Sequence, residues 1–443
     1  MVQDSTVAQN GTLSGKASTS NVGTALVGAK GFKRHNPRSD RFPIHKFHHF
    51  EFWTGEATMT AKRFTYGLGM PQVAKSDQST GNHHFASYVL QSNDLVFAVT
   101  APYGRQAPQL AASSSPCPWY SQDKAYETIN AHGLYVRAVG LLVADAAEAY
   151  RISVEHGGEG VLEPTTLTDE VSGQQLVVSE IKAYGDCVLR FVSGSYEGPY
   201  LPGYETTPPA AGAPDFGLQR CDHAVFNTHN LLEAVQYLSR AVGFHEFAEF
   251  VADDVGTLDS GLNSMVLANN SEMVLMPVNE PTFGTKRKSQ IQTYLEQNQG
   301  PGLQHLALKT DDIFRTMREM RARADCGGFD FMPWPEGDYY RQLPARIGKV
   351  LSEEQYKAVE ELGLLVDADD QGVLLQVFTK PLGDRPTVFF EIIQRLCLAS
   401  SEAPPPKRQR VQQEVGGCGG FGKGNFSALF KSIEVYETDL GIN

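Results

Sequence analysis

The feature that most constrains the fold of this chain is an internal repeat. At one constant offset, His49 aligns with His223 and Gly69 aligns with Gly243. Each copy has a short apolar run, then a helix-like pattern, then glycine, which is a common residue after the end of a helix. In the second copy the helical stripe consists of Leu231, Leu232, Val235, Leu238 and Val242. The two halves of the chain should therefore begin with the same strand-helix unit.

A second repeat divides each half again. At a slightly shorter offset, Val139 aligns with His305 and Asp145 aligns with Asp311. Both copies predict a strand, a helix that begins at an aspartate, a Gly-Gly pair and a further strand. We therefore predict an α+β fold of two tandem domains, each built from paired βαβββ modules that form an open curved barrel.

Changes in composition set the expected domain boundaries. Residues 1–40 are rich in Ser, Thr, Gly and Ala, which is typical of a disordered tail, although plastid transit peptides are also Ser-rich and poor in acid. Residues 195–217 are dense in Pro and Gly and cannot continue a helix or a central strand, so we expect an interdomain linker there. We expect a first barrel domain at 41–200, a linker at 201–217, and a second barrel domain at 218–443 that ends in a lid helix.

The composition also excludes several classes of protein. The chain has 51 acidic and 38 basic residues and a net charge of -13, which is the opposite of a nucleic-acid binder. No apolar run approaches the roughly 20 residues needed to span a bilayer. The six cysteines are scattered and form no CxxC pair, so we expect free thiols in a reducing compartment rather than a zinc ribbon or a redox pair.

Three residues of the second half form a candidate metal site. His223 and His305 begin two modules, and Glu391 lies in the apolar run Thr387–Ile393. A carboxylate in such a strand is costly to bury unless it is paired or binds a metal. Two imidazoles and one carboxylate form the facial triad of non-haem Fe(II) oxygenases, which leaves positions for a 2-oxo acid and O2. The sequence therefore predicts an Fe(2+) site at these three residues.

The first half keeps only part of this pattern. It has His49, but it has Val139 in place of His305 and Arg190 in place of Glu391. Because a guanidinium has no lone pair to offer a cation, we predict that the domain at 41–200 is non-catalytic and that the domain at 218–443 is catalytic. Cys221 lies close to His223, and we expect a buried free thiol there in preference to a metal ligand.

Four segments carry a family resemblance. They are RCDHAVFNT at 220–228, QGPGLQHLALKTDDI at 299–313, PTVFFEIIQR at 386–395 and GGCGGFGKGNFSALF at 416–430. Together they resemble 4-hydroxyphenylpyruvate dioxygenase of the plant type, over about residues 30–443. The last two segments are specific to that family, whereas the first two indicate only the wider vicinal-oxygen-chelate superfamily.

The resemblance implies an iron enzyme that converts 4-hydroxyphenylpyruvate and O2 to homogentisate and CO2. The implied steps are oxidative decarboxylation, ring hydroxylation and side-chain migration. This reaction belongs to tyrosine and phenylalanine catabolism, and in plants it supplies precursors of plastoquinone and tocopherol. The resemblance also implies a homodimer. We expect it in the cytoplasm, with the plastid as an alternative, and without nucleic-acid partners or membrane insertion.

The resemblance further implies the residues of the site. The metal ligands are His223, His305 and Glu391. The residues with implied catalytic roles are Ser264, Asn279, Gln290 and Gln376. The implied substrate-binding residues are Gln304, Phe378, Phe389, Phe421, Asn425 and Phe426. These residue types suit a phenol, because aromatic side chains can enclose its ring and amides or hydroxyls can bind its oxygen.

Strand geometry supports part of this set. If the hairpin turns between Gly383 and Asp384, Gln376 faces Glu391 and Phe378 faces Phe389. In a regular strand, Gln304 would point away from His305. Its place in the pocket therefore requires a local twist, a bulge or a less direct contact.

The last segment has the spacing of an amphipathic helix, with Phe426, Leu429, Phe430 and Ile433 on one side. Such a helix could pack permanently on the core. We prefer a lid that closes over the iron, with the preceding glycines as its hinge.

Other functions remain open from the sequence. A hydroxymandelate synthase would share the substrate, fold and triad but would hydroxylate the benzylic carbon. An extradiol catechol dioxygenase would share the two-module layout, although the motif at 421–430 opposes it. A metal-free binding protein would show no iron-dependent O2 uptake.

Overall fold

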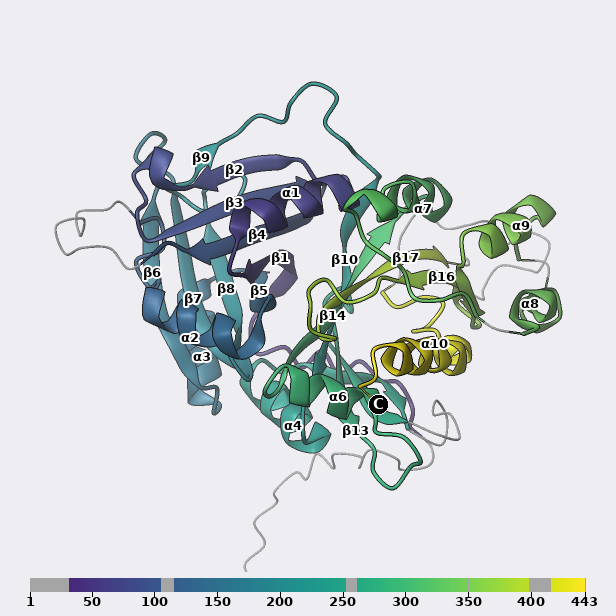
Figure 1. Ribbon diagram of the computed structural model, residues 1–443. Helices are drawn as coiled ribbons and strands as arrows, with labels where there is room; N and C mark the ends of the chain where they lie inside the picture. The colour runs from purple at the N-terminus through teal and green to yellow at the C-terminus, as the bar shows by residue number, and fades with distance from the viewer. Residues whose placement is uncertain are drawn as a thin grey trace, which may run out of the picture.

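The chain folds into two curved β-sheets that lie side by side (Figure 1). The computed structural model describes residues 32–104, 115–251, 261–335, 337–348, 350–397 and 416–442. Most of the predicted tail at 1–40, and the segment 404–410 with the sequence PPPKRQR, lie outside the described residues. Within these ranges, no helix is long and apolar enough to cross a membrane.

The N-terminal half forms a nine-stranded sheet with the order β6-β7-β8-β5-β1-β4-β3-β2-β9. Its strands are β1 (Ile44–Trp53), β2 (Gln72–Ser76), β3 (Phe85–Ser92), β4 (Leu95–Pro102), β5 (Tyr135–Val143), β6 (Gly160–Thr168), β7 (Gln175–Tyr184), β8 (Cys187–Gly194) and β9 (Glu205–Thr206). Its helices are α1 (Ala57–Leu68), α2 (Gln122–His132) and α3 (Ala146–Glu155). Strand β9 lies in the Pro- and Gly-rich segment, pairs with β2 and forms one edge of the sheet.

The C-terminal half forms an eight-stranded sheet with the order β11-β12-β13-β10-β14-β17-β16-β15. Its strands are β10 (Leu218–Asn227), β11 (His245–Phe250), β12 (Leu262–Ala268), β13 (Leu275–Pro281), β14 (Gly302–Thr310), β15 (Leu365–Ala368), β16 (Gly372–Phe378) and β17 (Phe389–Cys397). Its helices are α4 (Leu231–Ala241), α6 (Gln290–Gln297), α7 (Ile313–Arg321), α8 (Tyr339–Ile347), α9 (Glu353–Glu361) and α10 (Phe426–Asp439).

The predicted βαβββ modules are confirmed by the strand pairing. Each module closes with a parallel pair between its first and last strands: β1 with β4, β5 with β8, β10 with β13, and β14 with β17. Within each half, the first strands of the two modules pair antiparallel. The fourth module differs because α8 and α9 are inserted before its β15.

The pairing register corrects the alignment of the second repeat by one residue. Ala138 pairs with Glu51 of β1, and His305 pairs with Val225 at the matching place of β10. Ala138, and not Val139, therefore occupies the position of His305.

The helix caps explain this error. Asp145 caps α3, and its counterpart in α7 is the cap Asp312, whereas the sequence alignment used the neighbouring Asp311. Adjacent aspartates made the two offsets hard to separate. Arg190 pairs with Gly140, the partner of His49, and Glu391 pairs with Ala307, the partner of His223. Arg190 and Glu391 therefore occupy equivalent positions, and this match is confirmed.

The two halves share an aromatic core that fixes the orientation of β17. Successive side chains of a strand point to opposite faces. Phe390 packs against Phe64 and Phe97 of the N-terminal half, with ring centroids 5.5 and 5.7 Å away. Its neighbours Phe389 and Glu391 therefore face the concave side of the second sheet, where both line a cavity.

A disulfide joins the end of β17 to the Gly-rich loop before α10. Cys397 and Cys418 are bonded, so the expectation of free thiols is wrong for these two residues. The two cysteines are 21 residues apart, but the loop returns beside β17 and brings their Cα atoms to 5.6 Å. That return cannot be read from spacing alone. The remaining cysteines are free, and they include the buried Cys221, as predicted.

Candidate metal centre and substrate pocket

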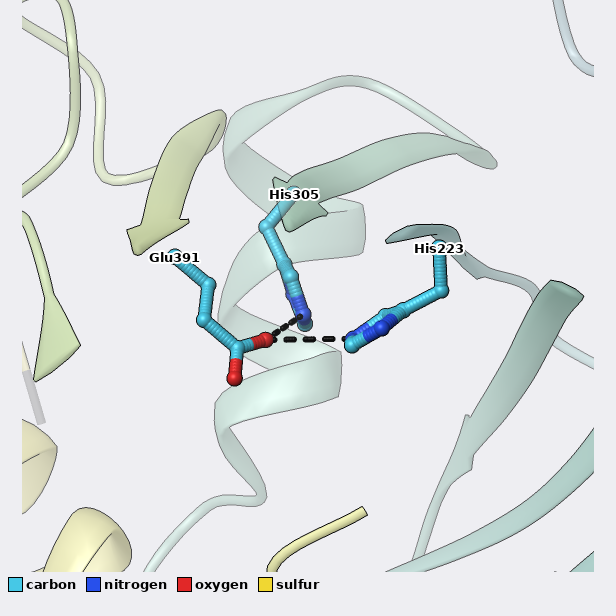
Figure 2. Close-up of side chains that lie close together, drawn as sticks. All are labelled: His223, His305 and Glu391. Atoms are coloured by element: carbon cyan, nitrogen blue, oxygen red, sulfur yellow. Dashed lines mark ion pairs between the residues drawn. The ribbon is translucent and has the colours of Figure 1, made fainter. Parts of the chain in front are cut away.

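Three neighbouring strands bring the predicted metal ligands together. His223 lies on β10, His305 on β14 and Glu391 on β17, and one ligand atom of each lies within 4.8 Å of the others. The Nε2 atoms of His223 and His305 are 3.1 and 3.4 Å from Oε2 of Glu391 (Figure 2). Among the described residues, no second group of His, Cys, Asp and Glu side chains has this arrangement.

Two β-bulges aim the histidines. The register of β10 against β14 shifts between Cys221 and His223, so Asp222 is the extra residue of the first bulge. It shifts again where His305 and Leu303 pair with consecutive residues of β10, so Gln304 is the extra residue of the second. A bulge lets adjacent side chains turn toward the same region. Of the twist, the bulge and the less direct contact considered for Gln304, the structure contains the bulge, and Gln304 and His305 both line the cavity.

The residue before each histidine fixes the orientation of its ring. Nδ1 of His223 donates to Oδ2 of Asp222 at 2.8 Å, and Nδ1 of His305 donates to Oε1 of Gln304 at 2.9 Å. Each ring therefore keeps the Nε2 lone pair for a cation. Two neutral imidazoles and a carboxylate, with no thiolate, are a donor set that suits Fe(II).

The site also holds Glu391 in its ionised form. Burial favours the neutral acid, but the facing rings of His223 and His305 outweigh burial and lower the pKa of Glu391 to about 2. Burial lowers the pKa of His305, which favours the neutral ring. Burial acts in the same direction on His223, but Glu391 and Asp222 outweigh it and raise the pKa of that histidine.

A cavity lies in front of the three ligands. Nine further residues named from the sequence line it: Ser264, Asn279, Gln290, Gln304, Gln376, Phe378, Phe389, Phe421 and Phe426. Leu429 and Ile433, which were predicted on the apolar side of the last helix, also line it. Its remaining walls were not predicted, and they are Val225, Phe250, Leu262, Val266, Pro277 and Gly422. These are ordinary apolar residues and glycine, so only their strand or helix position could have indicated them.

The polar groups of the cavity come from opposite sides. Ser264 and Asn279 face each other across β12 and β13. The amide of Asn279 donates to Oδ1 of Asn227 at 3.1 Å, which leaves its carbonyl oxygen for the cavity. On the other side, Oε1 of Gln376 is buried and has no hydrogen-bond partner among the residues that the structure describes.

Gly422 allows the C-terminal loop to approach Gln376. Its φ is +74°, and a Cβ at this position would lie 2.5 Å from Nε2 of Gln376. A side chain would therefore clash as well as strain the backbone. The loop can reach the cavity wall only because this residue is glycine.

The predicted hairpin register is wrong by two residues. Gln376 pairs with Ile393, and Phe378 pairs with Glu391. The turn therefore centres one residue later than predicted, between Asp384 and Arg385. A shift of two residues preserves which face each side chain occupies, so the predicted patch survives the error.

Asn425 lies outside the cavity lining. Its side chain is buried, and its Oδ1 accepts hydrogen bonds from Tyr339 at 2.7 Å and from Arg346 at 2.9 Å. Asn425 thus holds the start of α10 against α8.

Two charged residues near the metal ligands escaped the sequence analysis. Asp222 is buried beside His223, and Arg395 pairs with it through two hydrogen bonds of 2.9 and 2.7 Å. Arg395 lies in the same strand as Glu391, where a buried charge is costly, but Asp222 lies between Arg220 and His223 in a segment that is not apolar.

The N-terminal half has a salt-bridge cluster at the equivalent place. Arg190 lies 3.1 Å from Nε2 of His49, 2.7 Å from Glu51 and 2.8 Å from Glu180, and all four residues are buried. The guanidinium occupies the position that a cation would need, as the sequence predicted.

Comparison with known proteins gives a consistent family. No family model matches the chain. A 4-hydroxyphenylpyruvate dioxygenase from Plectranthus scutellarioides is 54% identical over 420 residues, which cover 94% of this chain and 94% of that protein. The enzyme of the same name from Daucus carota is 54% identical over 431 residues, covering 96% and 95%. The one from Neurospora crassa is 35% identical over 408 residues, covering 89% and 92%.

A solved structure shares the fold at low identity. A mutant of 4-hydroxymandelate synthase from Streptomyces coelicolor superposes with a TM-score of 0.69 and 22% identity, over 89% of this chain and 99% of that one. This likeness describes the architecture alone. The near-full-length identity to the plant enzymes carries the assignment: the chain belongs to the 4-hydroxyphenylpyruvate dioxygenase family.

Proposed function

We propose that this chain is an Fe(II)-dependent dioxygenase that converts 4-hydroxyphenylpyruvate and O2 to homogentisate and CO2 in tyrosine catabolism. The observation that carries the proposal is the convergence of His223, His305 and Glu391 in the lining of a cavity with aromatic walls. A protein that only bound a phenolic acid would not need three metal-ligand side chains there.

The site would hold Fe(II) through Nε2 of His223, Nε2 of His305 and the carboxylate of Glu391. Bound there, the metal supplies open coordination positions and the electrons that O2 activation by a 2-oxo acid requires. Asp222 and Gln304 accept hydrogen bonds from Nδ1 of the two rings, which would direct each Nε2 toward the metal.

The cavity walls would bind the rest of the substrate. Phe378, Phe389, Phe421 and Phe426 enclose the aromatic ring. The hydroxyl and amide groups that bind the phenol oxygen and hold the ring in place would be those of Ser264, Asn279, Gln290, Gln304 and Gln376. The unpartnered Oε1 of Gln376 and the carbonyl oxygen of Asn279 are acceptors available to a phenol hydroxyl.

Helix α10 would exclude water from the reaction. Phe426, Leu429 and Ile433 of α10 line the cavity, and α10 lies over the second sheet in Figure 1. Closure would protect reactive species from solvent. Asn425 contributes by fixing the start of this helix and not by contact with the substrate.

We also propose that the domain at 41–200 is structural. The buried Arg190 cluster supports this role, since it fills the place of the metal. Family membership is the ground for proposing a homodimer and a cytoplasmic location, with the plastid as the alternative. Light scattering of the purified chain and imaging of a full-length fusion test these two points.

Anaerobic loading with Fe(II), followed by 4-hydroxyphenylpyruvate and air, tests the reaction. We expect homogentisate and CO2 in equal amounts. The His223→Ala variant should lose iron and product, whereas the His229→Ala variant, whose histidine is exposed just beyond β10, should keep both. Formation of 4-hydroxymandelate, or no O2 uptake by the iron-loaded chain, would contradict the proposal.

A further inference from the structure

A single buried guanidinium lies between a metal ligand and the C-terminal loop. Nε and Nη2 of Arg395 donate to the two carboxylate oxygens of Asp222 at 2.9 and 2.7 Å. The same Oδ2 of Asp222 accepts from Nδ1 of His223 at 2.8 Å. The Arg395 side chain is 0% exposed, so water cannot replace these bonds.

The other edge of the guanidinium holds the C-terminal loop. Nη1 of Arg395 donates to the carbonyl oxygens of Cys418 and Gly420 at 2.7 and 2.6 Å. Its Cζ lies 5.4 Å from the centroid of the Phe421 ring. The ring centroid of Phe421 in turn lies 5.3 Å from that of His223. The contacts therefore form a closed cycle from His223 through Asp222, Arg395 and Phe421 back to His223.

We propose that Arg395 is a positioning residue that couples the seating of the loop 416–422 to the orientation of His223, through Asp222. The planar fork of arginine can bond a carboxylate on one edge and two carbonyls on another, whereas a lysine ammonium is a single point charge. The inference deepens the proposed function, because it assigns to that site a link between its metal ligand and its aromatic wall.

Coupling of this kind acts in both directions. If Arg395 joins the loop to His223, metal binding at His223 must make the loop harder to open, and a seated loop must raise the metal affinity by the same factor. A residue that merely filled space would change stability without linking these two quantities.

Hydrogen exchange and Co(II) titration of the full chain test the coupling without turnover. For the wild type, we expect Co(II) to slow exchange in a peptide covering residues 416–425 by about 5- to 150-fold, the usual range of coupling between two sites. In the Arg395→Met variant this slowing should disappear, and Co(II) affinity should fall by about 10- to 100-fold, as for other residues that orient a metal ligand.

The matched control is Arg346→Met. Arg346 also holds the C-terminal segment, through Oδ1 of Asn425 at 2.9 Å, but it bonds to Tyr339 and Val366 rather than Asp222. Its loss should speed exchange with and without metal, while both the Co(II)-dependent slowing and the Co(II) affinity remain. Comparison of the two variants distinguishes coupling through Arg395 from a general loosening of the C-terminal segment.

The proposal would be overturned if Arg395→Met had wild-type Co(II) affinity and if Co(II) still slowed hydrogen exchange at 416–425 as it does in the wild type. If that variant fails to fold, Arg395→Lys decides, because it keeps the charge next to Asp222 but loses the fork; wild-type values in this variant would also overturn it. A wild-type chain that binds no Co(II) would overturn both this inference and the proposed function. Co(II) binding with normal coupling, but no homogentisate from the Fe(II)-loaded chain, would overturn the proposed function alone.

Discussion

The two histidines of the metal site differ in the side chains that hold them. His223 donates to a carboxylate, Asp222, whereas His305 donates to a neutral amide, Gln304. A carboxylate makes the ring a stronger donor to a metal. An amide orients the ring at lower cost and keeps an N–H group that can reach a substrate. Gln304 therefore serves both the metal and the pocket, which explains why a bulge at this residue is useful.

Replacing Gln304 with leucine should weaken metal binding. The Gln304→Leu variant leaves Nδ1–H of His305 without an acceptor, so the ring can turn away from the metal. We expect Co(II) affinity to fall by about 10- to 100-fold, as for other residues that hold a ligand. Calorimetric titration measures it.

The control is Gln290→Leu. Gln290 lines the same cavity from the start of α6, and its loss should reduce turnover while Co(II) affinity stays unchanged. Equal affinities in the two variants would show that Gln304 does not orient His305.

At the scale of elements, α10 lines the cavity without contributing a metal ligand. Its buried face includes Leu429, Phe430 and Ile433, and Phe430 packs with the cluster around β11 and α6. The glycine loop before it is held separately, by Arg395 and by the disulfide. The helix and the loop can therefore be tested independently.

Truncation after Phe421 should abolish homogentisate formation and leave the metal site intact. The shortened chain keeps Arg395, Asp222 and the loop up to Phe421, so Co(II) affinity should stay close to wild type, and the far-ultraviolet circular dichroism spectrum should lose only the helical signal of α10. Truncation after Leu440 is the control and should retain activity, because α10 ends at Asp439. Normal turnover by the shorter chain would refute a closing role for α10.

The disulfide between β17 and the loop should contribute to stability under oxidising conditions. Crosslinking residues 21 positions apart restricts the unfolded chain, and closing a loop of this size contributes about 3 kcal/mol. We expect Cys418→Ser to lower the free energy of unfolding in urea by about this amount. The difference should vanish when both proteins are reduced, and Cys326→Ser, which removes an exposed free thiol, should have no effect.

The elements were predictable from the sequence, whereas their registers were not. Apolar periodicity located the modules, and one charged residue in an apolar strand located Glu391. The bulge at Asp222, the exact turn of the 376–391 hairpin and the partner of Cys397 depend on long-range pairing, which a local pattern does not encode. The hairpin error was harmless because it preserved side-chain parity. The one-residue error at Val139 did matter, because it assigned the wrong counterpart to His305.

At the scale of the whole molecule, the two halves use the same row of positions for opposite purposes. His49, Gly140 and Arg190 form one row, and His223, Ala307 and Glu391 form the equivalent row. The first row has the positive Arg190 where the second has the negative Glu391. Arg190 therefore binds the carboxylates of Glu51 and Glu180, whereas Glu391 is available to a cation. The first half then packs against Phe390 and holds β17 in place.

Loss of Arg190 should therefore destabilise the protein without changing its metal site. Arg190→Met leaves Glu51 and Glu180 buried, with Arg137 as the remaining partner of Glu180, and breaking a buried ion pair costs about 3–5 kcal/mol. Urea unfolding should show this loss, while Co(II) affinity of the folded variant should equal that of the wild type. Arg151→Met, which removes exposed salt bridges on α3, should change neither quantity. A fall in Co(II) affinity for Arg190→Met alone would show that the N-terminal cluster takes part in the metal site, and the division of labour between the halves would have to be abandoned.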